Sequence, residues 1–225
     1  TIIDPEIDVG AETEQIAGTD ILNMIKPQDA LDKANANPDK FMHLRGNVFP
    51  SIVVPNFGFG LLMKYEVNSE LVSETNLFKY DYRDDYAAVF GFNFRLFNGI
   101  VKLGANTRVV NRTEIRRDDI DPLSTGLERD TLASEGVGVG SDVGLLIAAP
   151  IAWIPTLGVV YRDAGSTSYK LRGGMFSNTD ERPDRTPATL DVGLAIHPIL
   201  GKRFRSTWTV EFRDSMATEE TSGTD

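Results

Sequence analysis

The chain has few of the side chains on which most enzymes depend. It contains no cysteine, so it offers neither a thiolate nucleophile nor a zinc–thiolate centre, and its two histidines are His43 and His197. A serine hydrolase triad needs a histidine beside the nucleophile. His43 precedes the first clear strand pattern and His197 adjoins Pro198 at an expected turn, so neither indicates a triad. We therefore predict no catalytic residue, no metal site and no cofactor, and we do not expect an enzyme.

Two short motifs are typical of ligand sites, but a simpler interpretation is preferred for each. Asp118, Asp119 and Asp121 could together collect a divalent cation, yet their segment lacks the ligand pattern of an EF-hand. The alternate glycines of Gly136–Gly140 resemble a phosphate-binding loop, but the P-loop lysine is missing. We interpret the first motif as a solvated acidic loop and the second as glycines of a β-strand.

Charged and amide side chains instead recur at alternate positions of the apolar segments. If these segments are strands of a barrel, this set faces the lumen, where it could line a polar pore or hold the head group of a ligand. The preferred alternative is that the charges pair with one another, because buried charges need partners. The set predicted to face the lumen is Lys64, Glu66, Arg95, Lys102, Asn106, Arg108, Asp142, Arg162, Asp191, Arg205, Glu211 and Arg213.

Beyond Pro50 the apolar residues alternate with polar or small ones at a period of two, which predicts β-strands. The strand at Tyr86–Leu96 carries a wide aromatic face that suits lipid, and Asn98–Gly99 after it favours a tight hairpin turn. The residues predicted to face lipid are Phe59, Phe90, Phe92, Phe94, Leu103, Val143, Leu145, Leu190, Leu194, Trp208 and Phe212. The expected strands are Gly58–Val67, Tyr86–Leu96, Ile100–Val110, Val137–Ala148, Thr156–Arg162, Ala188–His197 and Phe204–Asp214, with Ser51–Phe57 as an eighth candidate.

The expected connections between strands alternate between short and long. Outer-membrane barrels have this asymmetry, with short periplasmic turns and long external loops. Because the seventh strand would end on the outer side, the chain is expected to form either a closed eight-stranded barrel or an arc of a larger one. The short connections are Phe97–Gly99, Pro150–Pro155 and Pro198–Arg203, and the long ones are Asn68–Asp85, Asn111–Gly136 and Asp163–Pro187.

Three regions follow from these patterns. Residues 1–41 form an acidic, partly helical segment or long loop, residues 42–216 form the barrel strands, and residues 217–225 form a polar tail. Within the first region an amphipathic pattern at Asp20–Ala36 predicts two short helical pieces separated by Pro27. The formal net charge of −10 without a basic patch argues against a nucleic-acid partner. No apolar run reaches the roughly 18 residues of a transmembrane helix, whereas barrel strands need only about 9 to 11.

The second half of the chain resembles the long-chain fatty acid transporter-like superfamily of bacterial outer-membrane β-barrels, in particular its uncharacterised or secretion-associated branch. The likeness rests on the glycine-rich segment Ser134–Pro150, the Leu-Gly-x-x-x-Arg segment Thr156–Asp163 and the segment Thr186–Ala195. It matches the branch at Asp142, Gly144, Leu157, Gly158 and Arg162. Residues 1–40 do not match the plug that the transporters of the family thread into the lumen.

The predicted fold is thus all-β, an antiparallel transmembrane β-barrel or an arc of one, with a short helical N-terminal stretch. The resemblance implies a bacterial outer-membrane protein that is a passive channel or transporter for hydrophobic small molecules. The alternatives are a barrel that anchors or docks another envelope protein complex, and a soluble lipid-binding β-barrel. Expected partners are outer-membrane lipid, lipopolysaccharide and, in the docking alternative, an envelope protein.

Overall fold

The structure is a computed structural model that describes residues 5–11, 25–176, 179–200 and 204–213. It is mostly antiparallel β-sheet, with 59% strand and 9% helix, which confirms the all-β prediction. The main sheet follows the path β1-β2-β4-β5-β6-β7-β8-β10-β13, with β3 paired to β4 and β9 to β7. The strands are β1 (Pro5–Ala11), β2 (Met42–Val48), β3 (Ser51–Val54), β4 (Phe57–Val72), β5 (Leu77–Leu96), β6 (Val101–Ile120), β7 (Ser134–Ala148), β8 (Thr156–Arg162), β9 (Arg172–Gly173), β10 (Thr189–Ile196) and β13 (Trp208–Phe212).

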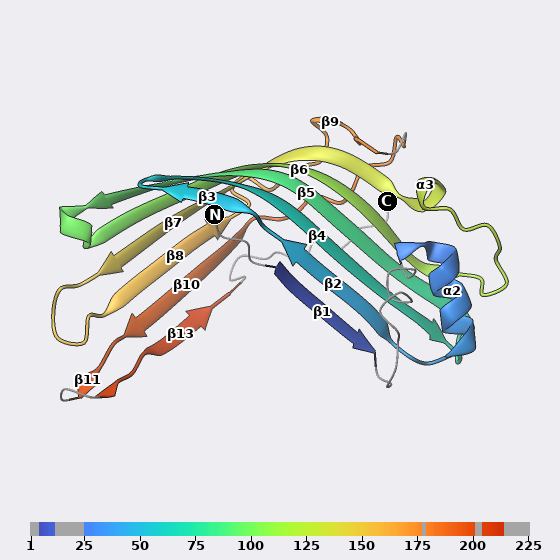
Figure 1. The fold of residues 1–225 in the computed structure, drawn as a ribbon, viewed down its shortest axis with the longest axis horizontal. Coiled ribbons are helices and arrows are strands. Elements are labelled where there is room, and N and C mark those ends of the chain that lie inside the picture. The colour runs from blue at the N-terminus through green and yellow to red at the C-terminus, as the bar shows by residue number, and fades with distance from the viewer. Residues whose placement is uncertain (1–4, 12–24, 177–178, 201–203, 214–225) are drawn as a thin grey trace, which may run out of the picture.

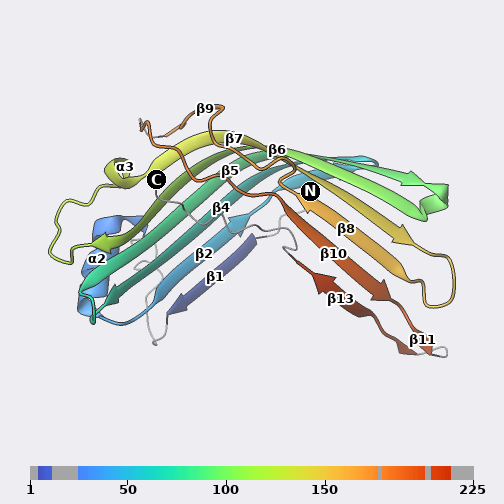
Figure 2. The same ribbon diagram turned by 180° about the vertical axis from the view of Figure 1, so that it is seen from behind.

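The sheet is an arch that is not closed into a barrel (Figures 1 and 2). Its crown consists of the long strands β4 to β7, and its open edges are β1 and β13, at the two feet of the arch. The short strand β2 pairs with the part of β4 near Val72, whereas β8 pairs with the part of β7 near Ala148. In the sequence, β10 and β13 are connected by a separate hairpin of β11 (Ile199–Leu200) and β12 (Phe204–Arg205). The predicted closed barrel is therefore not what the described residues form.

Strand register divides the side chains between two faces. Paired residues of neighbouring antiparallel strands point to the same side of the sheet. A single row of paired residues crosses six strands, and the next row, one residue along, points to the opposite side. The first row contains Phe57, Phe92, Ala105, Val143, Tyr161 and Leu190, and the second contains Gly58, Gly91, Asn106 and Asp142. We call the side of the first row the apolar face and the side of the second row the polar face.

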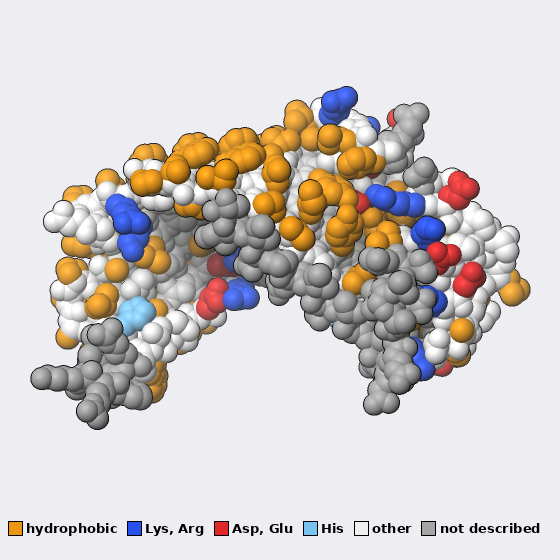
Figure 3. Space-filling model, in the orientation of Figure 1, with side chains coloured by type: hydrophobic (Ala, Val, Ile, Leu, Met, Phe, Trp, Pro, Cys, Tyr) orange, Lys and Arg blue, Asp and Glu red, His pale blue; other side chains and the backbone are white. Residues whose placement is uncertain are grey.

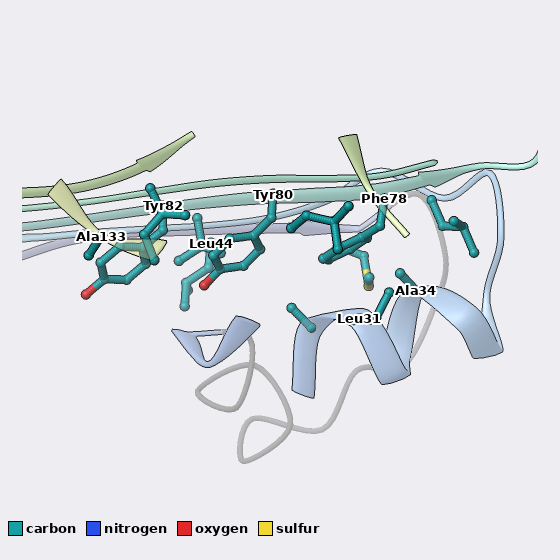
Figure 4. Close-up of a cluster of buried hydrophobic side chains, with 13 residues drawn as sticks. Leu31, Ala34, Leu44, Phe78, Tyr80, Tyr82 and Ala133 are labelled. Carbon is teal, nitrogen blue, oxygen red and sulfur yellow. The ribbon is translucent and has the colours of Figure 1, made fainter. Parts of the chain in front are cut away.

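The hydrophobic core lies on the apolar face at one end of the arch. There the helix α2 (Pro27–Ala36) packs against β2, β4 and β5, with Leu31 and Ala34 pointing at Leu44, Phe78 and Tyr80 (Figure 4). All five of these side chains are buried. A one-turn helix, α3 (Arg129–Leu132), adds Ala133 to the same cluster. The helix α2 thus covers only one part of the apolar face.

The N-terminal region differs from its prediction. Pro27 does not interrupt a helix but begins one, because the first helical position needs no backbone N–H donor. Residues 12–24, which hold the other predicted helical piece, lie outside the described residues. Pro5–Ala11 adds strand β1 to the sheet beside β2, so the first 41 residues are more than a helical segment or loop. Among the described residues, no helix is long and apolar enough to span a membrane.

One of the predicted long loops is wrong, and a second is shorter than predicted. Asn68–Asp85 is a hairpin, since β4 continues to Val72 and β5 starts at Leu77, leaving only a four-residue turn. Likewise β6 continues to Ile120 and shortens the next loop. The strict alternation of short and long connections therefore fails at one position. The predicted tight turn after Leu96 is confirmed, with a 3-10 turn, η2 (Phe97–Gly99), and Asn98 and Gly99 both at positive φ.

Candidate functional site

Beyond α2, large hydrophobic side chains of the apolar face are exposed among the residues that the structure describes. Phe92, Phe94, Val143 and Leu194 are 45%, 60%, 51% and 56% exposed, although all four are large hydrophobic side chains. Figure 3 shows hydrophobic side chains gathered along the upper rim of the arch. Contiguous apolar surface on this scale is uncommon on monomeric soluble proteins and marks an interaction surface. The exposed apolar face is therefore the first component of the candidate site.

Every residue predicted to face lipid lies on this apolar face. Phe59 pairs with Phe90, Leu103 with Phe94 and with Leu145, and Leu190 with Tyr161. On the outer strands Leu194 pairs with Val210, between the pairs that contain Trp208 and Phe212. The structure thus brings the predicted set together on one side of one sheet, and whether lipid is what covers that side stays a prediction.

On β5, β6 and β7 the exposed part of the apolar face forms a band, which on β4 extends one row further to Met63, 41% exposed. It occupies nine residues on each of three neighbouring strands, and its two end rows are in register. One end row pairs Ala88, Val109 and Val139, and the other pairs Leu96, Val101 and Ile147. At about 3.3 Å per residue and a strand tilt of 35–45°, nine residues rise roughly 20–25 Å, the height of the apolar belt of an outer-membrane barrel.

Aromatic side chains border this band at both ends. At the α2 side, the hydroxyls of Tyr65 and Tyr86 are hydrogen bonded at 2.8 Å, and the ring of Phe176 lies 5.4 Å from that of Tyr86. At the opposite side, Trp153 and Trp208 are 54% and 68% exposed. Amphipathic aromatic rings of this kind favour a membrane–water interface.

Next to the Tyr65–Tyr86 pair, the apolar face carries buried polar side chains. Asp84 is 1% exposed there, accepting hydrogen bonds from the Tyr82 hydroxyl at 2.8 Å and from Arg129 Nη2 at 2.9 Å. The pKa of Tyr82 is raised above its ordinary value, mainly because the phenol is buried and secondly because the carboxylate of Asp84 lies beside it. Glu135 is also fully buried, and its Oε1 accepts from Asn111 Nδ2 at 2.8 Å. These polar groups separate the exposed band from the core beneath α2.

The polar face pairs most of its own charges. Arg108 Nη1 lies 2.8 Å from Asp142 Oδ2, and its Nη2 bonds to Asp163. In the same way Arg162 Nε lies 2.7 Å from Asp191 Oδ2. The structure therefore places these predicted lumen-facing charges as mutual partners, as the preferred interpretation expects.

The rest of the predicted lumen set is less enclosed. Glu211 and Arg213 are exposed and bonded to each other at 2.9 Å, and Lys102 is exposed opposite Arg95. Asn106 lines an open groove of about 390 Å³ on the polar face. For Arg205, in β12, the side chain lies outside what the structure describes.

Seven glycines of the polar face fall into two groups. Gly58, Gly91, Gly104 and Gly144 line the groove, and a Cβ added at any of them would meet nothing closer than 3.7 Å. Gly136, Gly138 and Gly140 are instead covered by the chain segment that follows β8. A Cβ at Gly138 would lie 2.6 Å from the Ser168 carbonyl oxygen, so this part of the polar face is closed.

The remaining predicted motifs form no site in the described part of the chain. Asp118 and Asp119 belong to β6 rather than to a loop, and no group of three metal-binding side chains occurs among the described residues. His43 lies in β2 beside Phe41, and His197 Nδ1 lies 3.2 Å from Thr207 Oγ1. Gly136–Gly140 belongs to a strand, as interpreted from the sequence.

Two structural elements of the site were missed by sequence reasoning. The first is the extension of β5, although Phe78, Tyr80 and Tyr82 alternate with charged residues and signal a strand. The second is the covering segment after β8, for which the sequence held no specific signal, because uncovered glycines of the same face give the same pattern.

Comparison with protein-family models, with curated proteins and with solved structures found no match for this chain. The resemblance to the fatty acid transporter-like barrels therefore stays a prediction.

Proposed function

We propose that this chain is an arc of an outer-membrane β-barrel that provides a passive pathway for small molecules. In this proposal the apolar face contacts lipid acyl chains and the polar face lines the lumen. The observation that carries it is the exposed apolar band, nine residues high on three strands with aromatic side chains near both ends, on the reverse of a face that pairs its own charges. The sequence resemblance adds hydrophobic molecules as the expected class of cargo.

The height of the band supports a bilayer rather than a protein partner. The height of the band matches the apolar belt of an outer-membrane barrel, because a bilayer imposes two boundaries on every strand that crosses it. The position of the aromatic residues, at these boundaries rather than at the centre of a contact patch, favours the same interpretation.

The number and direction of the strands determine whether an odd or an even number of further strands would complete such a barrel. The main path holds nine strands, each antiparallel to the next, so β1 and β13 run in the same direction. Bacterial barrels are antiparallel throughout and have an even number of strands. A closed antiparallel barrel therefore needs an odd number of further strands between β13 and β1, contributed from outside the described residues.

Membrane fractionation, combined with gel mobility before and after boiling, tests the proposal. A barrel is extracted only by detergent and shifts its mobility on boiling. Liposome swelling with sugars of graded size and uptake of a fluorescent fatty acid then test the pathway. A product soluble without detergent rejects the proposal in favour of the soluble lipid-binding alternative. A membrane-inserted protein that passes neither probe favours the docking alternative.

A further inference from the structure

The segment that closes the second group of glycines is held on the polar face by a specific set of contacts. We call the segment Asp163–Phe176 the strap. It leaves the sheet at the end of β8, lies on the polar face over the glycines of β7 with the Tyr169 side chain reaching β6, and pairs through β9 with the edge of β7 at Gly136 and Val137. At its far end it reaches the apolar face, where the Met175 backbone N–H donates to Glu135 Oε1 at 2.7 Å.

Two arginines of β6 anchor the strap. Arg108 bonds to both Asp142 of the sheet and Asp163 at the base of the strap. Arg112 lies with its guanidinium carbon 4.5 Å from the centre of the Tyr169 ring, while its Nε bonds to Asp85 Oδ1 at 2.6 Å. Because these arginines bond to the sheet and the strap together, the strap is a fixed part of the polar face.

The sheet is shaped to receive the strap. Tyr169 is 2% exposed and packs with Ala87 and Val110 in a small buried cluster on the polar face. Below it, Gly136 and Gly138 leave no room for a Cβ between strand and strap. The neighbouring glycines of the groove, above which no described segment lies, show that glycine on this face does not by itself attract a strap.

We propose that the strap is a constriction that sets the width of the polar pathway, an inference that rests on the proposed function. The backbone of a strap seated this close to the barrel wall occupies space that the lumen would otherwise offer. The polar face next to it stays open as the groove beside Gly104 and Gly144. The pathway is then narrowest at the level of Arg108 and Arg112.

A matched pair of glycine substitutions on β7 tests the constriction. Gly138→Val would place a side chain where the strap backbone lies and should expel the strap, whereas Gly144→Val adds the same volume to the same strand and face without touching it. Tyr169→Ala removes an anchor without changing the sheet and serves as the second test if Gly138→Val does not fold. Folding of each variant is checked by its mobility shift on boiling.

The natural absence of cysteine provides a readout that does not depend on transport. Ala87→Cys places one thiol under the strap, and Asn106→Cys places one in the open groove. With Gly138→Val or Tyr169→Ala, labelling of Cys at position 87 by a water-soluble maleimide should accelerate at least about tenfold, because a clash with the strap backbone or loss of the Tyr169 packing favours the open strap. Labelling at position 106 should not change.

Conductance in planar bilayers is the second readout. Expulsion of the strap should raise single-channel conductance in Gly138→Val and Tyr169→Ala, while Gly144→Val should leave it unchanged or lower it. Faster labelling at position 87 with unchanged conductance overturns the constriction, since the strap would then cover the face without limiting the pathway. Unchanged labelling overturns the seating of the strap itself. A protein that conducts nothing in any form rejects the proposed function, and labelling still decides whether the strap closes this face.

Discussion

Two valines of β7 test whether the apolar band lies in a lipid bilayer, because the two positions differ in little except their place in the band. Val139 and Val143 lie on the same strand and the same face, with exposed fractions of 48% and 51%. Val139 belongs to the end row of the apolar band, and Val143 belongs to its central row, paired with Ala105. In water, arginine at either exposed position should change the free energy of unfolding by the same small amount, within about 0.5 kcal/mol.

In a bilayer the two substitutions should differ. Arginine on the lipid face costs about 2–4 kcal/mol at the midplane and about 0–1 kcal/mol near the interface. We therefore expect Val143→Arg to lower the free energy of unfolding by about 2–3 kcal/mol more than Val139→Arg, which is a change of roughly 30- to 150-fold in the folding equilibrium. The assay is reversible urea unfolding in phospholipid vesicles, followed by the fluorescence of Trp153 and Trp208. Equal effects of the two substitutions would refute the placement of the band in lipid.

Two further predictions concern the end of the arch under α2. Leu31→Ala should lower the free energy of unfolding by about 2–5 kcal/mol because Leu31 is fully buried, whereas Leu123→Ala, at an 85% exposed position, should stay within about 0.5 kcal/mol in the same urea titration. Burial raises the pKa of Tyr80 and Tyr82 above the ordinary value, so both phenols stay protonated in the folded protein while those of an unfolded chain ionise near pH 10. The stability that they contribute is present below about pH 10 and is lost as the pH rises further. Tyrosinate absorbance at 295 nm from these two residues should therefore appear only together with loss of the α2 circular dichroism signal; ionisation near pH 10 with the helix intact would contradict this prediction.

The two faces of the sheet could be predicted from the sequence because side-chain alternation is a local property. Phe90, Phe92 and Phe94 lie on one face as predicted, since a period of two fixes the side of every residue once the strand is recognised. The same pattern continues through Phe78 and Tyr80 but was obscured by the acidic pair that follows. Asp84 stands on the apolar face only because groups far away in sequence, such as Arg129, satisfy it, and no local pattern reports such a partner.

The sequence could predict which side chains belong to the candidate site, but not how the chain covers them. The sequence indicated which charges share a face, and Arg108 with Asp142 is a cross-strand pair of that face. It did not indicate the strap, because the contacts of Tyr169 with β6 join residues more than fifty positions apart. Local sequence patterns also could not predict that the sheet stays open, because the pairing of its two edge strands depends on the geometry of the whole chain.

The short strands on the two sides of the sheet, β1 and β2 on one side and β8, β10 and β13 on the other, attach at opposite ends of the long strands, so the two edges of the sheet are offset along the strand direction. Following paired residues across the sheet, Pro5 of β1 projects onto Asn111 of β6, and Phe212 of β13 projects onto Leu103, eight positions away. The two edges of the arch therefore stand about 26 Å apart along the strand direction. In a closed sheet, the offset between neighbouring strands adds up to the shear, which makes the strands lean from the barrel axis. The offset within this chain thus favours inclined strands in any ring that it enters, and inclined strands enclose a wider bore than the same number of upright ones.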